Sequence, residues 1–119
     1  MKLSTVYPIK QLAQDFMESP QIKTVDKNAV LIFDYEKESG GYAQTEITFC
    51  DVLATKFIRE SEMELYMVEA YNEVAIVEDS PWIKEFGDNI AESGYKHFIV
   101  FFDEYGVYQF IAKSFEAAQ

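Results

Sequence analysis

The stretch KHFIVFFDEYGVYQFIA, residues 96–112, carries the strongest structural signal in the chain. Two apolar runs, His97–Phe102 and Val107–Ala112, flank the polar turn Asp103–Gly106. Gly106 can adopt the positive φ that tight hairpins often require, so the pattern predicts a β-hairpin. The first run is apolar on both faces, which indicates a strand near the centre of a sheet with cover on each side.

A second hairpin is predicted upstream of this region. The run Ala29–Tyr35 is short and rich in branched and aromatic residues, and it precedes a Gly40-Gly41 loop. In the next run, Thr45–Phe49, apolar and polar residues alternate, which is typical of a strand with one buried face. The alternation breaks at Asp51–Leu53 and resumes in Ala54–Ile58. This break predicts a bulge or corner at which one strand bends into the next.

Helical signals occur in three segments. Pro8–Met17 spaces its apolar residues as an amphipathic helix does, and we expect a helix there. Ser80 can cap a first turn and Pro81 suits its first position, so we expect a helix that ends at Gly87 or Gly94. Glu62–Tyr71 has a helical stripe followed by β-branched residues. We expect a short helix there that runs into a strand over Glu73–Glu78.

The fold class follows from these elements. Hairpins joined by short connections favour an antiparallel sheet, and the helical segments place the chain in the α+β class. Hydrophobic residues make up 49% of the 119 positions, which is enough to bury a core. We expect a single domain over residues 1–119, with a mainly antiparallel sheet of about five strands and two or three helices.

The compartment is indicated by cysteine usage and by the start of the chain. Cys50 is the only cysteine and cannot form a bridge within the chain, which favours a reducing environment. The first residues lack the apolar region of a signal peptide, and no run approaches the roughly 18 apolar residues of a membrane span. We therefore expect a cytoplasmic protein.

The charge balance limits the kinds of partner. The chain has 21 acidic and 10 basic residues, and its formal net charge is −11. Residues 1–37 are balanced, so residues 38–119 carry the whole excess. An acidic field repels nucleic acid, whose phosphates need clustered Lys and Arg, and it also disfavours an anionic membrane surface. A basic protein is the partner that this charge favours.

The chain offers few residues for catalysis or metal binding. The chain has one histidine, His97, and one cysteine, Cys50, which are too few ligands for a zinc site. We expect His97 to be a packed or edge histidine. No serine lies in a G-x-S-x-G motif and no glycine-rich phosphate loop is present. Asp103 and Glu104 lie in a predicted turn, where water would keep both ionised. The sequence therefore predicts a non-enzymatic protein without cofactor or metal.

The segment between Glu60 and Asp79 is the candidate partner-binding surface. It contains seven acids and no base, together with two tyrosines of the amphipathic type that anchors interfaces. Such a run can also be only the solvated face of an ordinary element. As a binding site it comprises Glu60, Glu62, Glu64, Tyr66, Glu69, Tyr71, Glu73, Glu78 and Asp79.

Four motifs in the second half of the chain occur in a distinctive order. They are ITFCDV (47–52), EAYNEV (69–74), DSPWI (79–83) and the hairpin of residues 96–112. Across residues 45–115 the chain resembles a widespread group of small uncharacterised bacterial proteins, several of which are thought to be immunity proteins that neutralise a toxin. The resemblance implies a protein that inhibits a basic toxin, such as a nuclease, by occlusion, and it implies no catalytic residues.

Two alternatives remain open at this point. Ten Phe and eight Tyr could line an aromatic pocket between sheet and helices, which would make the protein a small-molecule-binding module or an enzyme. A homodimer that buries an exposed strand edge is the third possibility.

Overall fold

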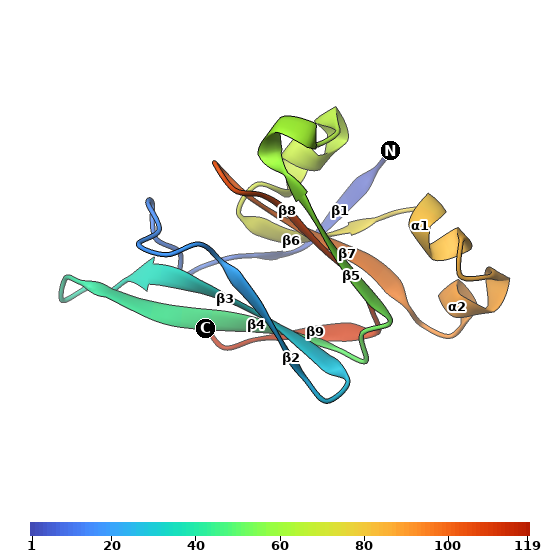
Figure 1. Cartoon of the computed structure of the whole chain (residues 1–119), viewed down its shortest axis with the longest axis horizontal. Helices are drawn as coiled ribbons and strands as arrows, with labels where there is room; N and C mark the ends of the chain where they lie inside the picture. Colours follow the sequence, from blue (N-terminus) through green and yellow to red (C-terminus); the bar gives the residue numbers. More distant parts are fainter.

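The computed structural model describes residues 1–119 and contains two antiparallel β-sheets packed face to face (Figure 1). The large sheet has the order β1-β6-β7-β8-β5, with β1 (Leu3–Pro8), β5 (Ala54–Arg59), β6 (Glu73–Val77), β7 (Lys96–Phe102) and β8 (Gly106–Ala112). The small sheet has the order β2-β3-β4-β9, with β2 (Gln21–Val25), β3 (Asn28–Glu36), β4 (Tyr42–Cys50) and β9 (Ser114–Ala117). The antiparallel pairing was predicted correctly. The expectation of one sheet with about five strands was wrong, because the strands divide into a sandwich.

Both predicted hairpins are confirmed. β7 pairs with β8 from Lys96 opposite Ala112 to Phe102 opposite Gly106. β3 pairs with β4 from Ala29 opposite Phe49 to Glu36 opposite Tyr42. β7 is the third of five strands in the large sheet and is buried along its length after its first residue, as its apolar sequence indicates.

The predicted corner between β4 and β5 is also confirmed. Asp51 adopts a positive φ of 53°, and the chain turns there from the small sheet into the large one. Leu53 N–H donates to the Ile111 carbonyl (2.8 Å), and Lys113 N–H donates to the Cys50 carbonyl (3.0 Å). These bonds hold the β8–β9 connection beside the β4–β5 corner, where β5 pairs with β8 and β4 pairs with β9. The two sheets therefore share one long antiparallel strand pair that passes from one sheet to the other at its middle.

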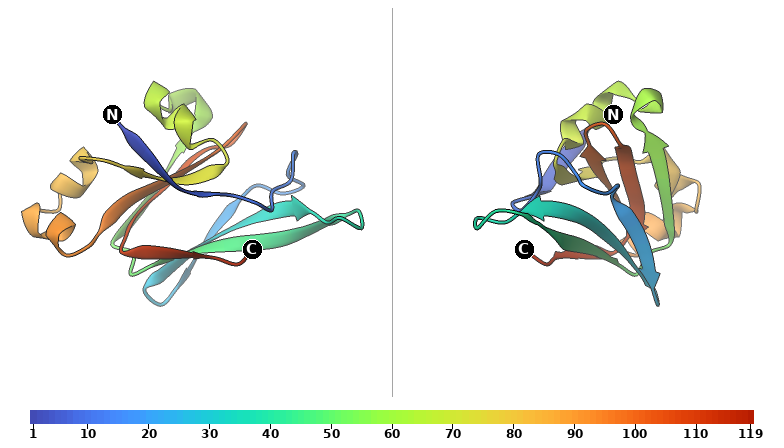
Figure 2. Two further views of the ribbon diagram at one scale, coloured as in Figure 1. Left: turned by 180° about the vertical axis from the view of Figure 1, so that it is seen from behind. Right: turned by 60° about the vertical axis from the view of Figure 1, so that its left-hand side comes forward.

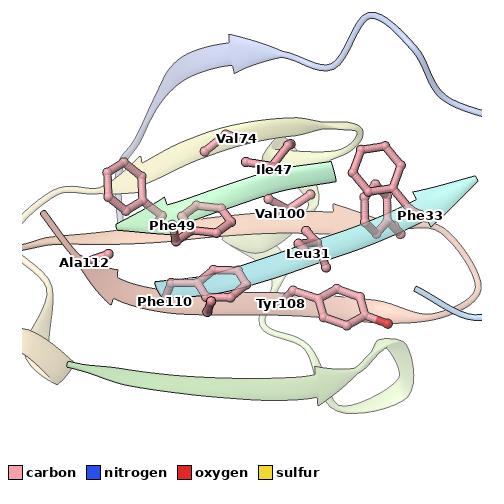
Figure 3. Packing of buried hydrophobic residues seen from close by; sticks show 12 residues of the cluster. Leu31, Phe33, Ile47, Phe49, Val74, Val100, Tyr108, Phe110 and Ala112 are labelled. Carbon is pink, nitrogen blue, oxygen red and sulfur yellow. The ribbon is translucent and has the colours of Figure 1, made fainter. Parts of the chain in front are cut away.

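The main core lies between the sheets (Figure 3). Phe49 of the small sheet stacks on Phe110 of the large sheet, with ring centroids 3.9 Å apart and an interplanar angle of 10°. Because both sheets contribute to one continuous cluster, the chain forms a single structural unit. The buried members are Ala29, Leu31, Phe33, Ile47, Phe49, Val74, Phe98, Val100, Phe102, Tyr108, Phe110 and Ala112.

A second core covers the outer face of the large sheet. Two 3₁₀ helices, η1 (Glu60–Glu62) and η2 (Leu65–Ala70), lie over this face on the side away from the small sheet (Figure 2). Two short α-helices, α1 (Pro81–Lys84) and α2 (Asp88–Glu92), lie at one end of the same sheet. None of these helices has the length and apolar character needed to cross a membrane.

Of the elements predicted between Glu62 and Gly94, the start of α1 and the strand β6 are confirmed, and the helix over Glu62–Tyr71 is not. The Ser80 hydroxyl accepts from Ile83 N–H (3.3 Å) with Pro81 in the first turn, so α1 begins where expected. The strand expected near Glu73–Glu78 is β6. The segment Glu62–Tyr71, expected as one short helix, forms the separate 3₁₀ helices instead, since its chain returns to extended dihedrals at Met63 and Glu64.

The helix predicted over Pro8–Met17 was wrong. Ile9, Leu12 and Phe16 do pack onto the main core, whereas Met17 is 70% exposed, and the backbone is irregular after β1. Its amides donate to distant acceptors in place of helical carbonyls: Ile9 to the Asn72 carbonyl (3.1 Å), Ala13 to the Asp34 carbonyl (3.0 Å), Lys10 and Gln11 to Gln119 Oε1, Gln14 to Glu36 Oε1, and Met17 and Glu18 to Asp34 Oδ2. Tertiary hydrogen bonds thus replace those of a helix.

Candidate functional site

The structure divides the nine candidate residues into two groups. Six lie on the 3₁₀ segment, residues 60–71, over the large sheet: Glu60, Glu62, Glu64, Tyr66, Glu69 and Tyr71. The other three lie at the two ends of β6. Glu73 begins the strand, and Glu78 and Asp79 follow its last residue, which lies about 13 Å further along at about 3.3 Å per residue.

The three residues that flank β6 have structural roles. The Glu73 carboxylate accepts a hydrogen bond from Thr5 Oγ1, and Glu78 accepts from Ser4 Oγ (2.8 Å). Both bonds join β6 to the edge strand β1. Asp79 adopts a positive φ of 52° in the turn that leads to α1. These three acids therefore stabilise contacts and turns within the fold. Among the acids of the 3₁₀ segment, only Glu60 has a side-chain hydrogen bond, which it forms with Asp103.

An exposed apolar ridge runs along η2 and consists of Leu65, Val68 and Tyr71. A 3₁₀ helix has three residues per turn, so side chains three apart stack in a row. Tyr71 N–H donates to the Val68 carbonyl (3.1 Å), which continues this row past the end of η2. Their exposed fractions are 88%, 47% and 45%. Three large apolar side chains side by side in solvent are a feature of interaction surfaces.

The opposite side of η2 fixes the ridge to the sheet. Met67 and Ala70 are buried against the outer face of the large sheet, and Met63 and Tyr66 pack partly onto the same cluster. Burial and the neighbouring Glu64 carboxylate raise the pKa of Tyr66. Tyr66 therefore packs the segment onto the sheet and lies near Glu64. Tyr71 is the more exposed of the two predicted tyrosines.

Unpaired carboxylates border the apolar ridge. Glu62, Glu64 and Glu69 are exposed, and the single ion pair of the structure lies elsewhere, between Lys2 Nζ and Glu78 Oε2 (3.6 Å). Sequence reasoning found these acids but missed Leu65 and Val68. The signal that could have found them is the apolar period of three that ends at Tyr71, which suits a 3₁₀ helix better than an α-helix.

A buried polar network lies under α1, at the other end of the outer face. Ser80 Oγ is 2.7 Å from His97 Nδ1, and His97 Nε2 is 2.7 Å from Gln109 Oε1. The carbonyl oxygen of Gln109 can only accept, so the imidazole carries its proton on Nε2. His97 Nδ1 then accepts the hydroxyl proton of Ser80. All three side chains are at most 4% exposed.

This environment keeps the imidazole neutral. Burial lowers the pKa of His97 to about 4; the Gln109 hydrogen bond opposes the shift, and the nearby Lys56 charge adds to it. The Trp82 ring meets the imidazole edge-on at 5.0 Å, and Lys56 Nζ lies 4.2 Å from the centroid of the same indole. The prediction of a packed histidine is confirmed.

Ser80 and His97 have the separation of a nucleophile and its base, yet the local chemistry favours support of α1. A base whose conjugate acid has a pKa near 4 is poorly matched to proton transfer at neutral pH. The Ser80 oxygen also accepts from Ile83 N–H as the cap of the helix. This arrangement holds the first turn of α1 against β7.

Ser80→Ala is expected to lower the free energy of unfolding by about 2 kcal/mol, because it removes a helix cap and leaves His97 Nδ1 buried without a donor. Urea denaturation of the two proteins measures the difference. Ser114→Ala, at an exposed position of β9, is the matched control and should change stability by less than about 0.5 kcal/mol. Equal effects at both sites would contradict the proposed role of Ser80.

Comparison with known proteins gives no relative: no family model, no curated protein and no solved structure matches the chain. The function is therefore inferred from the surface and the charges of the molecule itself.

Proposed function

We propose that this protein is a non-enzymatic acidic binding protein, an immunity protein that inhibits a basic bacterial toxin by covering its working surface. The observation that carries the proposal is the apolar ridge of η2 bordered by unpaired carboxylates. The motifs of residues 45–115, which resemble those of small uncharacterised bacterial proteins that include suspected immunity proteins, are the reason for choosing a toxin as the partner. The binding surface comprises the ridge together with Glu62, Glu64 and Glu69.

The two parts of this surface have different physical roles. Large side chains at the centre of an interface supply affinity when they are desolvated in a partner's pocket. Leu65, at 88% exposure, has the most area to lose. Carboxylates around them attract a basic partner over a distance and raise the association rate. Met67 and Ala70 hold the ridge on a sheet, so little ordering is required on binding.

Occlusion is a mechanism suited to this arrangement. A toxin that acts on nucleic acid needs a positively charged groove for the phosphates. An acidic segment that projects from a rigid sheet can enter such a groove and exclude the substrate without any chemistry of its own. The charge distribution supports this reading, since the 3₁₀ segment contains Glu60, Glu62, Glu64 and Glu69 and no Lys or Arg.

Charge reversal at the surface should slow association. The triple variant Glu62→Lys, Glu64→Lys and Glu69→Lys is expected to lower the association rate constant with a basic toxin domain about tenfold at low salt, because steering is lost. The partner to use is a purified basic toxin domain that binds the unmodified protein. Surface plasmon resonance at two salt concentrations measures the rate, and the salt dependence should flatten with the triple variant.

The control has the same change of net charge at a different place. Glu38, Glu46 and Glu116 are exposed and lie away from the 3₁₀ segment, so their reversal to Lys should have a much smaller effect. If both triple variants slow association equally, net charge alone governs the encounter and the surface on η2 is not the binding site.

A further inference from the structure

A cavity of about 230 Å³ opens beside the apolar ridge, at the end of the molecule opposite α1 and α2. The irregular segment after β1, the tip of the β7–β8 hairpin and the residues that follow η2 meet there (Figures 1 and 2). Tyr71 belongs both to the ridge and to the wall of this cavity. A partner seated on the ridge therefore lies at the mouth of the cavity.

Aromatic rings form much of the cavity wall. Phe16 and Tyr105 lie 5.4 Å apart between centroids, and Phe16 meets Phe102 edge-on at 5.3 Å. Asp34 holds the Phe16 side of the wall in place by accepting from Met17 N–H (2.7 Å). The wall is therefore built before a ligand arrives, and the faces of its rings carry negative electrostatic potential.

Carboxylates supply the charge of the cavity. Asp15, Asp103 and Glu104 line it, and no Lys or Arg does. Glu60 stands beside this group: partial desolvation raises its pKa, as do its side-chain hydrogen bond with Asp103 and the charges of Asp103 and Glu104. The charges of Asp103 and Glu104 therefore act on Glu60 at close range, and a cation beside these three carboxylates would relieve the repulsion.

We propose that this cavity is a socket for an arginine side chain of the basic partner, an inference that rests on the proposed function. A guanidinium group stacks on aromatic faces and forms paired hydrogen bonds with carboxylates, and both kinds of group line this cavity. The volume fits as well. About 230 Å³ is enough room for the seven heavy atoms of an arginine side chain. The socket provides a fixed point next to the apolar ridge.

The test uses a small probe and needs no toxin. Titration of the whole protein with N-acetyl-arginine methylamide, followed by NMR, should shift amide signals of residues 12–16, 71–72 and 102–105, with a dissociation constant in the millimolar range, on the order of 1 mM. N-acetyl-citrulline methylamide has the same shape without the charge and should cause no such shifts. The corresponding lysine probe should bind more weakly, since it lacks the planar group.

The variants remove charge and leave size unchanged. Asp15→Asn combined with Glu104→Gln should weaken binding of the arginine probe about fivefold. Asp26→Asn combined with Glu38→Gln, away from the cavity, should leave it unchanged. Equal shifts with the arginine and citrulline probes, or shifts spread over all acidic surfaces, would overturn the socket. If the socket fails while reversal at Glu62, Glu64 and Glu69 still slows association, the proposed function stands without it.

Discussion

Gly106→Ala is expected to destabilise the fold by about 4 kcal/mol, the largest loss we expect from adding a single methyl group. Gly106 has a φ of 145°, and a Cβ there would lie 2.2 Å from the Ile58 carbonyl oxygen and 2.8 Å from Arg59 Cα. Both atoms belong to the backbone of β5, so no side-chain rotation can relieve the contact. β5 would have to move away from β8, with which it pairs.

The measurement is urea denaturation, with Gly40→Ala as the matched control. Gly40 also has a positive φ, 91°, but nothing lies within 4 Å of its added Cβ. It should therefore cost only the backbone strain, about 1 to 2 kcal/mol. The difference between the two variants isolates the clash with β5. Equal losses would mean that the contact relaxes and that only the backbone conformation matters.

The same substitution connects the fold to the proposed binding surface. Glu60 N–H donates to the carbonyl of Tyr105 (3.2 Å), the residue before Gly106. The start of the 3₁₀ segment is therefore hydrogen-bonded to the turn between β7 and β8. Movement of β5 would displace Glu60 and the segment after it. Gly106→Ala should therefore weaken partner binding even under conditions in which the variant is still folded.

Local patterns identified the central hairpins because the information lies within each segment. Alternation in Thr45–Phe49, the apolar run of β7 and the Ser80-Pro81 start of α1 each depend on neighbours a few residues away. The corner at Asp51–Leu53 could also be predicted, because the break in the alternation of apolar and polar residues is visible within a few positions. Gly106 was expected for its positive φ, but its closeness to β5 could not be seen without the sheet order.

The segment Pro8–Met17 shows what such patterns cannot decide. Ile9, Leu12 and Phe16 do face the core, so the apolar spacing correctly indicated burial. The backbone conformation, however, depends on where its amides find acceptors, and those acceptors lie far along the chain, among them Asp34 and Gln119. The division into two sheets is equally non-local, because it depends on how the β4–β5 corner and β9 come together.

The sequence predicted which acidic residues belong to the candidate site, but not how they are arranged or which of them have partners. Charge counting found the acids of the 3₁₀ segment, but the distinction between Glu69, which is free, and Glu78, which joins β6 to β1, requires their partners. Spacing alone also could not show that Tyr71 connects the ridge with the cavity, since the other wall of that cavity comes from Phe16 and Tyr105.

Stability is expected to fall by about 3 kcal/mol between pH 6.5 and pH 4 because of His97 alone. The folded protein keeps the imidazole neutral with a pKa of about 4, whereas the ordinary value of 6.5 applies in the unfolded chain. Between these values the unfolded chain binds a proton that the folded protein does not. The free energy of unfolding therefore has its full value above pH 6.5, decreases as the pH falls toward 4, and loses nothing more from this group below that.

Denaturation curves at several pH values give the total dependence, and His97→Phe separates the histidine from the carboxylates, because phenylalanine does not titrate. The variant will be less stable overall, since Ser80 and Gln109 lose their partner, but the change in slope between pH 6.5 and 4 is the quantity of interest. A direct measurement is available as well: His97 is the only histidine, so its ring proton signal in NMR reports its pKa without ambiguity. A ring that titrates near 6.5, or equal slopes for both proteins, would mean that water reaches the imidazole and that burial under α1 does not keep it neutral.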